Sequence, residues 1–137
     1  MPSAASKHPT PMAVARIEFD LTVFSLGGIP TGGTFRLTLS PSDPCAVHIA
    51  AYTRSWVCDR GLLMAGRVGP AGPGELSFGP LTVDETRCVR VDLPGCEPVL
   101  LLKSELDAFL EATLASVPEG SEFQFSRLDD ELRGLDE

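Results

Sequence analysis

Two consecutive stretches decide the fold of this chain: WVCDRGLLMAG, residues 56–66, and PAGPGELSFGP, residues 70–80. The first predicts a strand end followed by a single helical turn, because the Asp59 carboxylate can accept a hydrogen bond from the free N–H groups that open a helix. The apolar residues inside the turn are expected to cover a sheet, and Gly66 is expected to end the turn in a left-handed conformation. The second stretch predicts a glycine-proline loop and then a short strand.

Alternating apolar residues predict further strands on both sides of these stretches. A continuously apolar run is expected instead for a central strand that is covered on both faces, and Val99–Leu102 has this pattern. No long helices separate the strands, so the pairing should be antiparallel and the class α+β, with antiparallel sheets, short helices and a long C-terminal amphipathic helix. The other expected strands cover residues 15–23, 35–39, 46–53, 55–58, 75–78 and 88–93, with a glycine-rich hairpin connection at 26–33.

The long amphipathic helix is predicted directly after the strand at 99–102. Ser104 is expected to cap it, with Asp107 as the acid of a capping box. Apolar residues at helical spacing mark its buried face, and Pro118 is expected to end it. Two further pieces are expected beyond it, an extended piece over Phe123–Phe125 and a short acidic helix over Leu128–Leu135.

Length and composition indicate one domain. The chain has 137 residues, of which 43% are hydrophobic, which is enough for a core. Residues 1–12, rich in Ser, Ala and Pro, are expected to form a disordered leader, and residues 13–137 a single domain. No secretory signal or membrane-spanning segment is expected, so we predict a cytoplasmic location without direct membrane insertion.

Charge and cysteine spacing argue against several function classes. The net charge is −8, whereas nucleic acids are bound mainly through Lys and Arg, so no nucleic-acid partner is expected. The four cysteines lack metal-binding spacing, and only His8 and His48 could add ligands. We therefore expect reduced thiols, no metal and no cofactor.

No residue pattern in the sequence indicates catalysis. His48 is expected to be a half-exposed sheet residue, although a small hydrolase that uses it with distant partners is an alternative. The carboxylates at 84–85 are expected in a solvated turn, and those at 129–131 at a helix N-terminus. The glycines at 27–28 and 32–33 lack the Lys of a phosphate-binding loop.

Two roles are considered for Trp56. It either packs in the core or sheet edge, or it anchors a subunit or partner interface, where Trp and Arg are enriched. The neighbouring Arg60 favours the second reading, and we name Trp56, Arg60 and Leu63 as a candidate interaction surface.

The ordered set of motifs resembles the SsgA-like proteins, the sporulation and cell-division family of actinomycetes. The resemblance runs from about Ile17 to Leu135, and the motifs are specific in this order and spacing rather than singly. They are DPCAV (43–47), WVCDRGLL (56–63), GELSFGP (74–80), LDAFL (106–110), VPEG (117–120) and FSRLDDEL (125–132). The sequence departs from the family at Cys45 and at 58–60, where other members often carry an aromatic residue and Phe-Ala-Arg.

The resemblance implies a non-enzymatic adaptor in sporulation-specific septation. Such a protein would help to recruit or position the tubulin-like division protein FtsZ at the septum, together with sister SsgA-like proteins. It also implies a fold similar to the whirly class of single-strand-binding proteins, assembled as a homotrimer. Single-stranded nucleic-acid binding is the alternative that this fold similarity suggests.

Overall fold

The computed structural model describes residues 16–40, 42–51, 53–72 and 74–118. The predicted leader, residues 1–12, lies outside the described residues, as do the extended piece Phe123–Phe125 and the acidic helix Leu128–Leu135. Within the described ranges, no helix is long and apolar enough to span a membrane.

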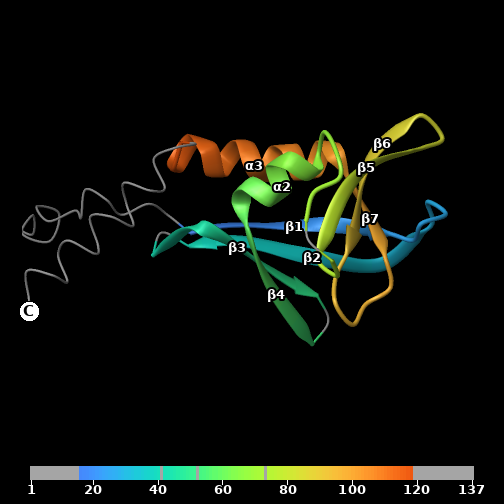
Figure 1. Cartoon of the computed structure of the whole chain (residues 1–137), viewed down its shortest axis with the longest axis horizontal. Coiled ribbons are helices and arrows are strands. Elements are labelled where there is room, and N and C mark those ends of the chain that lie inside the picture. Colours follow the sequence, from blue (N-terminus) through green and yellow to red (C-terminus); the bar gives the residue numbers. More distant parts are fainter. Residues whose placement is uncertain (1–15, 41, 52, 73, 119–137) are drawn as a thin grey trace, which may run out of the picture.

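Seven strands form a single antiparallel sheet in the order β4-β3-β2-β1-β7-β6-β5 (Figure 1). Every ladder is antiparallel, which confirms the predicted α+β class and the predicted antiparallel direction of the strands. β1 joins the two halves because it pairs with β2 on one side and with β7 on the other. The strands are β1 (Ile17–Phe24), β2 (Pro30–Ser40), β3 (Asp43–Ala51), β4 (Arg54–Asp59), β5 (Ser77–Val83), β6 (Thr86–Asp92) and β7 (Val99–Leu102).

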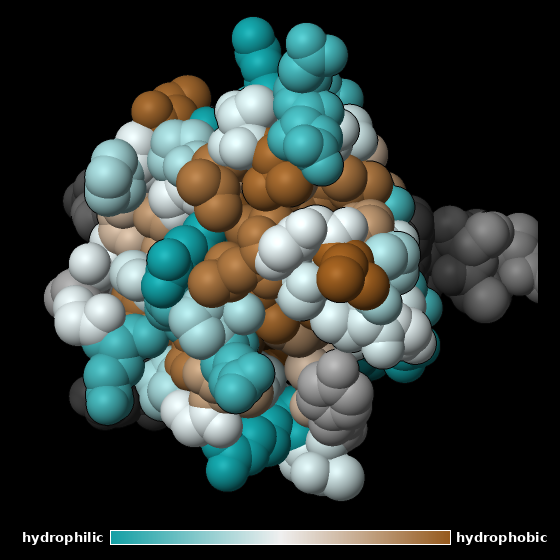
Figure 2. All heavy atoms as spheres, turned by 90° about the vertical axis from the view of Figure 1, so that its right-hand side faces the viewer, coloured by the Kyte–Doolittle hydropathy of each residue, from teal (hydrophilic) through white to brown (hydrophobic). Residues whose placement is uncertain are grey.

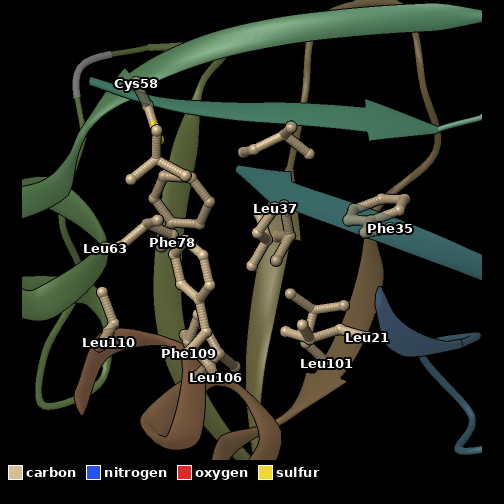
Figure 3. Close-up of a cluster of buried hydrophobic side chains, with 14 of the residues drawn as sticks. Leu21, Phe35, Leu37, Cys58, Leu63, Phe78, Leu101, Leu106, Phe109 and Leu110 are labelled. Carbon is tan, nitrogen blue, oxygen red and sulfur yellow. The ribbon is translucent and has the colours of Figure 1, made fainter. Parts of the chain in front are cut away.

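Two helices, α2 (Arg60–Gly66) and α3 (Lys103–Ser116), pack on one face of this sheet (Figure 1). Side chains from both helices and from alternate strand positions meet in one buried cluster (Figure 3). Leu63 of α2 and Phe109 of α3 are fully buried there. Phe109 packs edge-to-face on Phe19 of β1, with ring centroids 5.6 Å apart.

The central strand β7 has the predicted bounds and the predicted burial. Leu100 and Leu101 are both buried although they point to opposite faces, as expected for a strand covered on both sides. Only Leu101 belongs to the core beneath the helices. Leu100 is therefore buried on the face that carries no helix.

Two strands are longer than predicted. β2 begins at Pro30, because the Ser25 N–H donates to the Ile29 carbonyl at 2.8 Å and closes the hairpin early. β5 continues past Phe78 and through Pro80, where the sequence predicted an end. Proline is tolerated there because β5 is an edge strand, which has a neighbour on one side only.

Asp59 caps α2 as predicted, since its carboxylate accepts the Gly61 N–H at 2.9 Å. The predicted left-handed conformation of Gly66 is wrong, because Gly66 is helical and the C-cap is Arg67 at φ −75°. Glycine is needed at 66 for a different reason. A Cβ there would overlap the Cβ of Phe78, so this glycine lets α2 lie directly on β5.

The predicted cap of α3 is also wrong. Its N-cap is Leu102, which makes no side-chain capping bond, and Ser104 lies inside the helix. Glu105 in the first turn accepts the Thr22 N–H at 2.8 Å and so ties the helix to β1. The helix ends at the expected place, with Val117 as C-cap.

The expected capping-box acid, Asp107, has another role. It accepts hydrogen bonds from Arg67 at 2.9 Å and Lys103 at 3.0 Å. Partial burial would raise the pKa of this carboxyl, but the two hydrogen bonds outweigh it and hold the pKa below its usual value. Asp107 therefore fastens the loop after α2 to α3.

We predict that Gly66→Ala destabilises the protein by about 1–3 kcal/mol, because the added methyl group forces α2 away from Phe78. Gly69→Ala is the matched control, since a Cβ at Gly69 meets nothing within 4 Å. Urea unfolding followed by circular dichroism measures both variants. Equal stability of the two would contradict the close packing of α2 on β5.

Candidate functional site

The three residues predicted as an interaction surface lie at the junction of β4 and α2. Arg60 and Leu63 are fully buried, so neither is presented to a partner in this conformation. Trp56 is half-buried against the core, and its indole N–H donates to the Pro94 carbonyl at 3.2 Å. Of these three residues, only Trp56 has a side chain that is partly accessible to solvent. Its role in binding stays a prediction.

Arg60 is an interior residue rather than a surface cation. Its Nη1 donates to the Thr113 carbonyl near the end of α3, at 3.1 Å. Thr113 is itself buried, and its hydroxyl donates to the Leu110 carbonyl. A cation near a helix C-terminus is favoured by the helix dipole, so Arg60 links the start of α2 to the end of α3.

The residues considered for catalysis are not gathered into a site. His48 is exposed on β3, and its cross-strand neighbours are Thr38 and Val57, so no serine, cysteine or carboxylate stands directly opposite it. The 129–131 carboxylates lie outside the described residues. Among the described residues, no group of three or more His, Cys, Asp or Glu side chains could hold a metal ion.

All four cysteines are in the reduced form. Cys58 and Cys88 are buried, whereas Cys45 and Cys96 are half-buried. Burial, with the Asp59 charge as a smaller cause, raises the pKa of the Cys58 thiol to about 12. Burial also raises the pKa of Cys88. Neither thiol is therefore an activated nucleophile.

A hollow of about 290 Å³ opens on the face of the sheet that carries no helix. Phe24 pairs with Leu100 and Cys88 pairs with Leu102, so strands β1, β7 and β6 form its floor. We call this hollow the end groove. It is lined by Phe24, Gly28, Val83, Asp84, Thr86, Cys88, Leu100 and Leu102.

Two hairpin turns form the walls of the end groove. Gly28, at φ +86°, closes the β1–β2 turn, and a Cβ there would come within 3.1 Å of Val83 in the β5–β6 hairpin. Asp84 and Glu85 form the tip of that hairpin with φ of 48° and 68°, which fits the left-handed two-residue turn of tight hairpins. They are exposed, so the solvated turn predicted for them is confirmed.

Large apolar side chains are exposed on the two hairpins that wall the end groove, and we call these side chains its border. Ile29 is 68% exposed and Leu26 39% exposed on the β1–β2 turn. Leu81 is 38% exposed and pairs with Cys88 on the same face of β5. Figure 2 shows hydrophobic atoms gathered around a hollowed centre at this end of the molecule. Large contiguous apolar patches on protein surfaces often serve as interaction sites.

The end groove is suited to apolar contacts. Its floor offers apolar side chains, and its one charged lining residue, Asp84, lies at the rim. Sequence reasoning missed this groove because the 79–83 segment was not read as strand. The continuously apolar run at 99–102 was the available signal, since one of its two buried faces has no helix to cover it.

We predict that Arg60→Ala lowers the free energy of unfolding by roughly 2–5 kcal/mol, because it empties a fully buried site and removes a donor to Thr113. Thermal unfolding measures the stability, and light scattering measures the particle mass. A folded variant of unchanged stability and altered mass would instead support the interface role first predicted for Arg60.

We also predict that iodoacetamide modifies Cys58 roughly 1,000-fold more slowly than an exposed thiol at pH 8, because its thiolate is scarce. The unfolded chain ionises this thiol near its usual pKa. The stability from the buried neutral thiol is therefore complete below about pH 9 and falls as the pH rises toward 12. Mass spectrometry of labelled peptides reads the rate, with half-buried Cys96 as the comparison. Rapid labelling of Cys58 in the folded protein would contradict its burial.

Comparison with known proteins connects this fold to cell division. A family model described as Streptomyces sporulation and cell division protein, SsgA, matches residues 34–122. Two similar proteins are both named sporulation-specific cell division protein SsgB. The one from Frankia casuarinae is 31% identical over 123 residues, covering 84% of this chain and 86% of that protein. The one from Streptomyces coelicolor is 32% identical over 124 residues, covering 85% and 89%.

Solved structures show the same architecture. The crystal structure of an SsgA-like sporulation-specific cell division protein from Thermobifida fusca superimposes with a TM-score of 0.75 at 26% identity, covering 89% of this chain and 96% of that one. A second structure comes from a study of SsgB mutations in Streptomyces coelicolor, which correlate with longitudinal cell division during sporulation. It superimposes with a TM-score of 0.71 at 26% identity, covering 80% of this chain and 95% of that one. The matched family model, together with relatives above 30% identity over most of the chain, shows that this chain belongs to the SsgA family of sporulation and cell division proteins.

Proposed function

We propose that this chain is a non-enzymatic adaptor in sporulation-specific septation, which helps to recruit or position FtsZ at the septum together with sister SsgA-like proteins. Family membership gives the process. The observation that carries the adaptor role is the end groove, an uncovered apolar surface with exposed Ile29 and Leu81 at its border. FtsZ is the partner that the family resemblance implies.

The shape of the end groove supports binding of a protein partner. Its volume of about 290 Å³ is enough for one or two large apolar side chains, but it is at the lower limit for a small-molecule pocket. Burying an apolar anchor in a pocket of this kind is the usual source of binding energy at protein interfaces. The two hairpins that border it would meet the partner first.

The working form that we propose is a homotrimer in the cytoplasm at the division septum. The trimer follows from the family resemblance. Light scattering of the purified protein tests this part separately, since a monomer at micromolar concentration would contradict the trimer and leave FtsZ binding to be judged by itself.

We predict that the wild-type protein pellets with FtsZ polymerised by GTP, and that Leu81→Asp weakens this binding about tenfold by placing a charge at the border of the end groove. Ile29→Asp, on the other border, should have the same effect. Val68→Asp is the matched control, because Val68 is 82% exposed and lies outside the residues that line or border the groove.

Circular dichroism establishes that the three variants fold. If the wild-type protein leaves the pelleting and bundling of FtsZ unchanged, the proposed function is wrong. If FtsZ binds equally well to Leu81→Asp and Val68→Asp, FtsZ docks elsewhere and the role assigned to the end groove is wrong.

A further inference from the structure

The outer edge of β4 has no strand beside it among the described residues. β4 pairs with β3 over all six of its residues and ends the sheet order (Figure 1). In an antiparallel ladder, about half of the backbone N–H and C=O groups of an edge strand point away from its neighbour. About three residues of β4 therefore offer unpaired backbone groups over a strand roughly 20 Å long.

The opposite edge of the sheet, β5, is protected. Phe78 exchanges two backbone hydrogen bonds of 2.8 Å with Ala71 in the preceding loop. Pro80 has no N–H to offer, and α2 packs on Phe78 through Gly66. Native proteins protect edges by such devices because an open edge pairs with other chains. β4 has no proline and no lysine, and within the described ranges no strand pairs with its outer edge.

The side chains beside the open edge of β4 could pack against an added strand. Val57, on the face without helices, is 54% exposed, and Trp56, on the core side, is half-buried. A shallow hollow of about 270 Å³ adjoins the end of the strand and offers space for a small apolar side chain. It is lined by Cys45, Ala46, Val57, Cys58 and Asp59.

The positive charge of Arg54 favours an acidic residue in the added segment. Arg54 begins β4, is exposed, and forms no ion pair within the described ranges, and its guanidinium lies against Gly95. A carboxylate on the added strand could therefore pair with Arg54. The carboxylate of Asp59 at the other end is already engaged in capping α2. The fitting segment thus has apolar residues at alternate positions and an acidic residue at the Arg54 end.

Two-fold pairing of the β4 strands of two copies does not meet this requirement. In an antiparallel pair of β4 strands related by a two-fold axis, directly opposed side chains lie on the same face of the sheet. The helix-bearing faces of the two copies therefore lie on the same side only if the numbers of opposed residues add up to an even value. Arg54 then stands opposite residues such as Trp56, Cys58 or Arg60, and never opposite Asp59. A six-residue edge is also too short to bury by itself the roughly 1,200–2,000 Å² of a stable interface between folded proteins.

We propose that the edge of β4 is a strand-addition site that takes a short extended segment of a partner polypeptide, with alternating apolar residues and an acidic residue opposite Arg54. Backbone hydrogen bonds to β4 provide the affinity, and the contacts at Val57 and Arg54 provide the specificity. This site is separate from the end groove in its strands and in its lining residues. The proposal therefore does not depend on FtsZ binding there.

Fluorescence anisotropy with a defined probe tests the proposal. The probe is a fluorescein-labelled hexapeptide in which valine and threonine alternate and which ends in aspartate. Two further peptides have the same side chains but carry N-methyl groups on alternate amides, which removes their N–H donors. One peptide is methylated on the amides that face β4, and the other on the amides that face away from it. We expect the N-methyl peptide that is altered on the β4 side to bind at least tenfold more weakly than the probe.

Protein variants locate the binding. Val57→Lys should weaken the binding of the probe about tenfold, whereas Val68→Lys, at a still more exposed valine elsewhere, should not. Arg54→Glu should weaken the aspartate peptide and strengthen a peptide that ends in lysine. Hydrogen exchange should slow at the outward amides of residues 54–59 when the probe is bound.

Four results would overturn the proposal. The first is absence of probe binding at millimolar concentration, and the second is equal binding of both N-methyl peptides. The third is an Arg54→Glu variant that folds normally and keeps the preference for aspartate. The fourth is a change in particle mass caused by Val57→Lys, which would show that another copy of the chain occupies this edge.

Discussion

All of the helical cover in the described structure lies on one face of one sheet, and this one-sided packing determines what every other surface can do. α2 and α3 share a single core with alternate residues of the strands. The opposite face of the sheet is left to contact water or a binding partner. Near β2 it is polar, with Arg36 hydrogen bonded to Asp20 at 2.9 Å. Near β7 it is apolar and hollowed, and this second part is the end groove.

Most of the fold could be read from the sequence wherever the pattern is local. The bounds of β7, the Asp59 cap and the end of α3 before Pro118 follow from periodicity, capping chemistry and proline stereochemistry. The extension of β5 through Pro80 could not be read in this way, because a proline is tolerated only if its strand is at an edge, and edge position depends on the whole sheet. The same holds for Gly66, whose role depends on a contact with a distant strand.

The candidate site was less predictable than the fold. Arg60 follows a strand end, where an arginine is ordinarily solvated, yet it is fully buried and donates a hydrogen bond to a carbonyl near the end of α3. That carbonyl belongs to a residue about 50 positions away. The end groove is likewise assembled from two hairpins and β7, and its residues are ordinary apolar strand residues when each is considered alone. The family resemblance, in contrast, rests on many short motifs in order, and the comparisons confirm it.

The position of the indole of Trp56 has a practical consequence. Trp56 is the only tryptophan in the chain, and its N–H is tied to a carbonyl of the β6–β7 connection beside the outer strand. The fluorescence of an indole shifts to the blue when the ring loses solvent, so this protein contains its own optical reporter for the surface between β4 and the β6–β7 connection. Titrations of unlabelled material, in a spectrometer and without any dye, would therefore report on one defined place in the molecule.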